Sequence, residues 1–181
     1  MKAFFLASAT LLMAASSAQA TVLTVAGSYA RSCYTAAEAR VPSNAALLDC
    51  DRAFSQALTH EDEVATHVNR GVLYLISGDM MRASADFDRA IAMNPNQAEA
   101  WLDKSVLTLH QGDSRTAMQL AQRAMELGTR KPALALYVRA AAKEDAGDVK
   151  AAYSDLVRAA QLDPRWTLPK QELARFRVVN R

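Results

Sequence analysis

One dipeptide recurs along this chain at a nearly constant interval, and it limits the fold more than any other feature. The pairs are Gly78-Asp79, Gly112-Asp113 and Gly147-Asp148, which are 34 and 35 residues apart. The same two intervals separate the alanines at 83, 117 and 152, and those at 90, 124 and 159. A period of 34 in a chain rich in helix-forming residues predicts helix–turn–helix units stacked into an all-α solenoid.

The residue types assign a role to each repeated position. Each glycine suits the left-handed conformation that ends a first helix, and the aspartate after it can cap the second helix. The alanines allow two helices to approach closely. We therefore expect helix pairs at about 64–77 with 80–93, 98–111 with 114–127, and 133–146 with 149–162.

The repeats resemble the tetratricopeptide-repeat family, whose pattern places aromatic residues, glycine, alanine and proline at fixed positions. The first repeat supplies Gly71, Tyr74, Gly78, Ala83, Phe87, Ala90 and Pro95. The second repeat matches the pattern at Trp101, Gly112, Ala117 and Ala124. Ser105, Thr108 and Thr129 stand where the pattern has glycine, tyrosine and proline. The third repeat matches the pattern at Gly147, Ala152, Ala159 and Pro164, and Ala140 stands where the pattern has glycine. The resemblance implies repeats at 64–97, 98–132 and 133–166.

The segments on either side of the repeats are expected to cap the stack. Residues 31–63 read as a degenerate N-terminal helical hairpin that turns at Val41-Pro42, and residues 167–181 as a C-terminal capping helix. Cys33 and Cys50 would face each other across that hairpin and form a disulfide; the alternative is two buried free thiols. Residues 21–30 carry no pattern and are expected to form a flexible lead-in.

The first 20 residues have the three-part layout of a secretory signal peptide. Lys2 precedes an apolar run, and Ala18-Gln19-Ala20 offers a small-x-small cleavage site. The apolar run is shorter than the roughly 20 residues that span a bilayer, although a buried helix or a retained anchor is the alternative. We expect an exported protein, periplasmic if the source is Gram-negative, with no stable membrane anchor after cleavage.

No catalytic, metal or cofactor motif stands out. The three histidines are His60, His67 and His110, and the run that begins at His60 lacks the second histidine of an HExxH motif, because position 64 is valine. The formal net charge of +2 gives no electrostatic case for nucleic acid. We expect no cofactor and no enzyme activity; a small enzyme with a cryptic site is a remote alternative.

The family resemblance implies a concave groove lined by the first helix of each pair. The implied positions are Ala65, Val68, Asn69, Val72 and Ile76, then Glu99, Leu102, Asp103, Val106 and His110, then Leu134, Tyr137, Val138, Ala141 and Asp145. Tyr137 would be an aromatic anchor, and the acids would favour an apolar helix or an extended segment with basic residues. We expect an adaptor or assembly factor that binds a protein or peptide partner in the cell envelope; the alternative is a broad-specificity chaperone.

Overall fold

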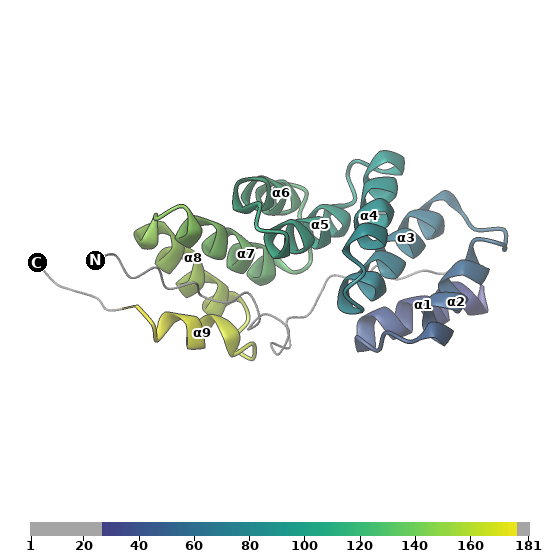
Figure 1. Ribbon diagram of the computed structural model, residues 1–181, viewed down its shortest axis with the longest axis horizontal. Helices are drawn as coiled ribbons and strands as arrows, with labels where there is room; N and C mark the ends of the chain where they lie inside the picture. Colours follow the sequence, from purple (N-terminus) through teal and green to yellow (C-terminus); the bar gives the residue numbers. More distant parts are fainter. Residues whose placement is uncertain (1–26, 177–181) are drawn as a thin grey trace, which may run out of the picture.

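The computed structural model describes residues 27–176, and these residues form a stack of helices without strands (Figure 1). The helices are α1 (Ser28–Ala39), α2 (Asn44–Ala53), α3 (His60–Ile76), α4 (Met80–Met93), α5 (Ala98–His110), α6 (Ser114–Glu126), α7 (Pro132–Asp145), α8 (Val149–Leu162) and α9 (Leu168–Leu173). The most extensive packing joins α3 to α4, α5 to α6, and α7 to α8. An all-α solenoid of three helix pairs is therefore confirmed.

The recurring Gly-Asp dipeptides act at the turn inside each pair, as predicted. Gly78, Gly112 and Gly147 adopt φ of 82°, 83° and 81°, the region that glycine enters without a steric penalty. The carboxylates of Asp79, Asp113 and Asp148 then accept hydrogen bonds from backbone N–H groups in the first turns of α4, α6 and α8. These caps satisfy donors that a helix start leaves unpaired.

Small residues set the distance between the two helices of a pair. The six repeated alanines are fully buried. Gly71 of α3 lies against the buried ring of Phe87 of α4, where an added Cβ would come within 2.6 Å of the ring. A side chain at position 71 would therefore push the pair apart, which explains the glycine.

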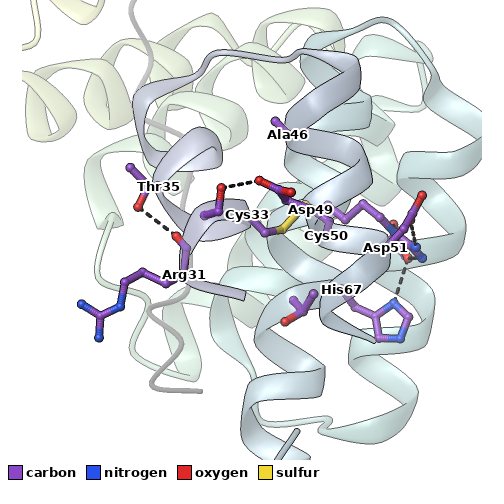
Figure 2. Close-up of a disulfide and its surroundings, with 12 residues drawn as sticks. Arg31, Cys33, Thr35, Ala46, Asp49, Cys50, Asp51 and His67 are labelled. Atoms are coloured by element: carbon purple, nitrogen blue, oxygen red, sulfur yellow. Dashed lines mark hydrogen bonds and ion pairs between the residues drawn. A yellow bond between two sulfur atoms is a disulfide. The ribbon is translucent and has the colours of Figure 1, made fainter. Parts of the chain in front are cut away.

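The Cys33–Cys50 disulfide crosslinks α1 and α2, the two helices of the N-terminal hairpin (Figure 2). The Cα atoms of the two cysteines are 4.9 Å apart. Both cysteines are fully buried, and α1 packs against α3 as well as α2. The structure differs from the expected lead-in at residues 28–30, which form the first turn of α1 because Ala30 is buried there. The expected signal peptide and residues 21–26 lie outside the described residues.

The other end of the stack is covered by a short segment. Trp166, Leu168, Leu173 and Phe176 pack around Tyr137 and Leu156. The helical part of the expected cap is only Leu168–Leu173, and residues 177–181 of the expected cap lie outside the described residues. No helix within residues 27–176 is long and apolar enough to cross a membrane.

Candidate functional site: the face formed by α3, α5 and α7

The groove positions lie on α3, α5 and α7, which contact one another in order along the stack. Most of the apolar positions are buried in the core between helices. Those in the cores are Val68, Val72, Leu102, Val106, Leu134 and Val138. Ala65 is also buried. These side chains fix the spacing of the three helices and offer little surface to a partner.

The accessible groove positions gather at the C-terminal ends of the three helices. Ile76 is the last residue of α3, His110 the last of α5 and Asp145 the last of α7. Ile76 and His110 are half-buried and Asp145 is exposed, while Ala141, one turn earlier in α7, is half-buried. We call Ile76, His110, Ala141 and Asp145 the groove row.

Tyr137, the expected aromatic anchor, belongs to the C-terminal core. Its ring lies 5.2 Å from that of Trp166, and only 8% of the residue is exposed. Burial raises the pKa of Tyr137 to about 12, with a smaller contribution from Glu172. Tyr137 therefore holds the C-terminal segment against α7, and its truncation would disturb the fold as well as the groove.

The polar groove positions have structural partners. The Glu99 carboxylate accepts hydrogen bonds from the backbone N–H of Arg130 at 3.1 Å and from its Nε at 3.3 Å, so it holds the α6–α7 loop. Asp145 accepts a hydrogen bond from the hydroxyl of Ser114. Asn69 and Asp103 are fully buried at neighbouring positions of α3 and α5.

Two cations outside the repeat positions interact electrostatically with Asp103 on this face, although the sequence favoured a solvated loop for Lys131. Arg40 ends α1 with a left-handed backbone, at φ 57°, and Lys131 precedes α7. Burial lowers the pKa of each, and the negative charge of Asp103 opposes this shift in both. Arg40 and Lys131 add positive charge near Asp103, and Glu38 adds a further negative charge near Lys131, so charges of both signs meet on this face.

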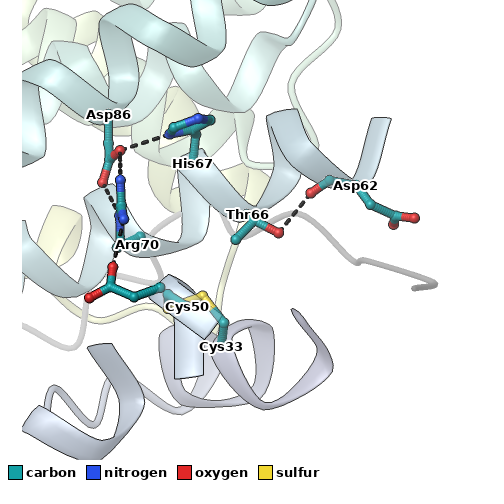
Figure 3. A network of polar contacts seen from close by, with 8 residues as sticks. Cys33, Cys50, Asp62, Thr66, His67, Arg70 and Asp86 are labelled. Carbon is teal, nitrogen blue, oxygen red and sulfur yellow. Dashed lines mark hydrogen bonds and ion pairs between the residues drawn. A yellow bond between two sulfur atoms is a disulfide. The ribbon is translucent and has the colours of Figure 1, made fainter. Parts of the chain in front are cut away.

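An ion-pair network joins α2, α3 and α4 (Figure 3). The guanidinium of Arg70 donates two hydrogen bonds of 2.8 Å to Asp86 and one of 2.6 Å to Asp51, while Nδ1 of His67 lies 2.8 Å from Asp86. Burial alone would raise the pKa of Asp86, but the bonds from Arg70 and His67 outweigh it and lower that pKa.

The third pair repeats this arrangement at equivalent positions. Arg139 donates hydrogen bonds of 2.8 and 2.7 Å to Asp155 and one of 2.6 Å to Gln122 of the preceding pair, and Lys143 also reaches Asp155. Burial opposes these bonds, yet the pKa of Asp155 is lowered. Both networks tie one helix pair to the preceding one.

The histidines do not form a site. Nε2 of His60 lies 3.2 Å from the carbonyl of Met93, His67 is held by Asp86, and His110 lies in the groove row. Burial lowers the pKa of His110. Within residues 27–176, no three potential metal-ligating side chains come together.

These shifts predict two separate losses of stability as the pH falls. A histidine whose folded pKa is lowered binds protons more readily when unfolded, so stability declines below the unfolded histidine pKa of about 6.5. The lowered pKa values of Asp86 and Asp155 stabilise the fold above about pH 4, and this contribution is lost as the carboxylates protonate. Urea unfolding followed by circular dichroism across this range should show both phases. His110→Gln should remove only the loss of stability that begins below about pH 6.5. If that loss is unchanged in the variant, His110 does not cause it.

The geometry is that of a scaffold for protein–protein interactions. A family model described as "Tetratricopeptide repeat" matches residues 87–119, from within α4 through α5 into α6. This part of the chain therefore matches a tetratricopeptide repeat, and repeats of this kind typically form non-catalytic interaction modules.

Among solved structures, "MamA RS-1 ArsTM double mutant" has the same fold. The match has a TM-score of 0.63 and 19% sequence identity, and covers 81% of this chain and 82% of that one. No curated protein sequence matches the chain.

Proposed function

We propose that this protein holds a peptide or helix of a partner protein along the face formed by α3, α5 and α7. The observation that supports the proposal most is the groove row, because Ile76, His110 and Asp145 occupy the same position in three successive repeats. An extended segment or helix can then make a similar contact with each repeat in turn. With Arg40 and Lys131 near Asp103, this face suits a mainly apolar segment carrying polar groups of either sign.

We further propose that the protein acts outside the cytoplasm, as an adaptor or assembly factor of the cell envelope. The signal-peptide pattern of residues 1–20 supports export. The disulfide supports it independently, because structural disulfides persist in oxidising compartments such as the periplasm.

Site-specific photo-crosslinking in living cells tests the proposed face. A photoreactive residue at Ile76, His110 or Ala141 should capture the same discrete partner, because these positions are accessible on one face. Matched control positions are Met81 of α4 and Arg158 of α8, which are exposed on second helices. Mass spectrometry of the crosslinked products identifies the partner.

The controls separate the possible outcomes. Equal capture from Met81 or Arg158 would move the binding surface away from the groove row. Capture of many unrelated exported proteins from the row would favour the chaperone alternative. Circular dichroism of each variant shows whether the stack remains folded.

A further inference from the structure

Positive charge gathers on α4, α6 and α8, the second helices of the three pairs, although the formal net charge of the chain is only +2. The exposed cations of these helices are Arg82, Arg89, Arg115, Arg123, Lys150 and Arg158. The exposed acids of the same helices are Asp88 and Glu126. The small net charge of the whole chain therefore conceals a basic surface on its second helices.

Three of these cations recur at the repeat period. Arg89, Arg123 and Arg158 are 34 and 35 residues apart, and all three are exposed. Among residues 27–176, no carboxylate lies within ion-pair distance of Arg89 or Arg158. Arg123 lies 3.7 Å from Glu126, and both side chains are about half exposed, so this pair contributes little. We call Arg89, Arg123 and Arg158 the arginine row.

The row lacks strong partners because the other acids of these helices are used elsewhere. Three aspartates each bind a cation of a first helix: Asp86 binds Arg70, Asp88 binds Lys104 and Asp155 binds Arg139. The aspartates that cap the second helices stand at their starts, ten residues before the arginines, which is about 15 Å along a helix axis. The charges of the first helices are thus neutralised inside the stack, and those of the row are left to the solvent.

The row lies on the outer side of the stack. The first helices α1, α3, α5 and α7 contact one another in order, whereas no comparable contact joins α4 to α6 or α6 to α8. Elements on the inside of a curved stack lie closer together than those on its outside, so these second helices form the convex side. The arginine row therefore faces away from the groove row.

An apolar side chain accompanies each arginine of the row. Met93, Leu127 and Leu162 follow the three arginines by four residues, which places each on the same side of its helix as the arginine. Leu162 is 50% exposed, and the other two are half-buried. Arginine beside exposed apolar side chains suits the boundary between lipid headgroups and acyl chains, where both kinds of group find partners.

We propose that the arginine row binds an anionic lipid surface and holds the stack against a membrane by its convex side. Lipid phosphates are mobile in the bilayer plane, so flexible arginines on three separate helices can each meet one without a fixed set of acids. Each basic residue near such a surface strengthens binding about fivefold, so the contact is reversible and depends on salt. The groove row stays accessible in this orientation, and the inference does not depend on what the groove binds.

Co-sedimentation with lipid vesicles measures the binding directly. The chain without residues 1–20 is used, because their apolar run would itself enter lipid. The vesicles contain equal parts phosphatidylglycerol and phosphatidylcholine, or phosphatidylcholine alone. We expect at least about tenfold stronger binding to the anionic vesicles, and loss of this preference near 1 M salt, where the Debye length is about 3 Å.

Matched double variants separate the row from the net charge of the chain. Arg89→Gln combined with Arg158→Gln should weaken binding to the anionic vesicles at least about tenfold. Arg31→Gln combined with Lys170→Gln removes the same charge from exposed positions of α1 and α9, at the two ends of the stack, and should weaken binding less than about threefold. Circular dichroism shows whether each variant remains folded.

The orientation on the vesicle is tested with a fluorescent amino acid at one of two positions of the second pair. Gln119 is exposed on α6, and His110 belongs to the groove row at the end of α5. Phosphatidylcholine that carries a nitroxide in its headgroup should quench the label at position 119 and leave the label at position 110 unquenched.

Four results would overturn the proposal. They are equal binding to the two kinds of vesicle, an equal loss of binding in the two double variants, and quenching at position 110 that matches or exceeds that at 119. The fourth is binding of poly-glutamate that depends on the row while anionic vesicles do not bind, which would assign the row to an acidic protein instead.

Discussion

Replacing Asp86 with alanine is expected to lower the free energy of unfolding by about 3 kcal/mol, because breaking a buried ion pair leaves its partner charge uncompensated. Asp86 is 4% exposed and accepts hydrogen bonds from both Arg70 and His67. Its removal leaves the Arg70 guanidinium half-buried between α2 and α4, with only the exposed Asp51 as an acceptor. Urea denaturation followed by circular dichroism measures the change.

Helix α4 also provides a matched control for the Asp86 variant. Asp88, two residues later, has a side chain that is 53% exposed and pairs with Lys104 on the surface. Surface ion pairs contribute less than about 1 kcal/mol, so Asp88→Ala should change stability only slightly. If the two alanine variants lose equal stability, the buried Arg70–Asp86 ion pair does not hold α3 and α4 together.

The ion-pair networks of the first and third helix pairs have no full counterpart in the second pair. The first and third pairs contain the bidentate pairs Arg70–Asp86 and Arg139–Asp155. At the equivalent positions the second pair has Lys104 and the buried Leu120, and Lys104 instead reaches back to Asp88. Each first helix therefore carries a cation that contacts the preceding pair, even where the bond within the pair is replaced by apolar packing.

The repeat period was sufficient to predict the six helices of the three repeats. Glycine and aspartate at fixed positions determine where a first helix ends and a second begins, and this depends only on local backbone chemistry. The Cys33–Cys50 pairing was also predictable, because a helical hairpin about Val41-Pro42 brings those two positions together. The one clear difference in the repeats is at α3, which begins at His60 because the side chain of Thr59 caps it.

The candidate site was less predictable, because accessibility depends on how neighbouring pairs pack. Repeat positions placed Tyr137 in the groove, but they could not show that Trp166, 29 residues later in the chain, packs against it. Arg40 and Lys131 lie in turns outside the repeat positions, so no periodicity pointed to them.

Removing the disulfide by the double substitution Cys33→Ala and Cys50→Ala is expected to lower the free energy of unfolding by about 3 kcal/mol. The bond closes a loop with a sequence separation of 17, and the unfolded chain gains entropy when that loop opens. Alanine is the appropriate replacement because both positions are fully buried, where a serine hydroxyl would add its own desolvation cost. Urea denaturation measures the loss.

Two further measurements distinguish the role of the bond itself from that of the surrounding packing. Dithiothreitol should destabilise the natural chain by a similar amount and leave the double alanine variant unchanged. Hydrogen exchange should accelerate most in α1 and α2 and little in α7 and α8, because a terminal pair with one neighbour opens first. If reduction changes neither stability nor exchange, the hairpin is held by its packing on α3. If exchange rises only in α1 and α2, the disulfide stabilises the terminal hairpin without affecting the rest of the stack.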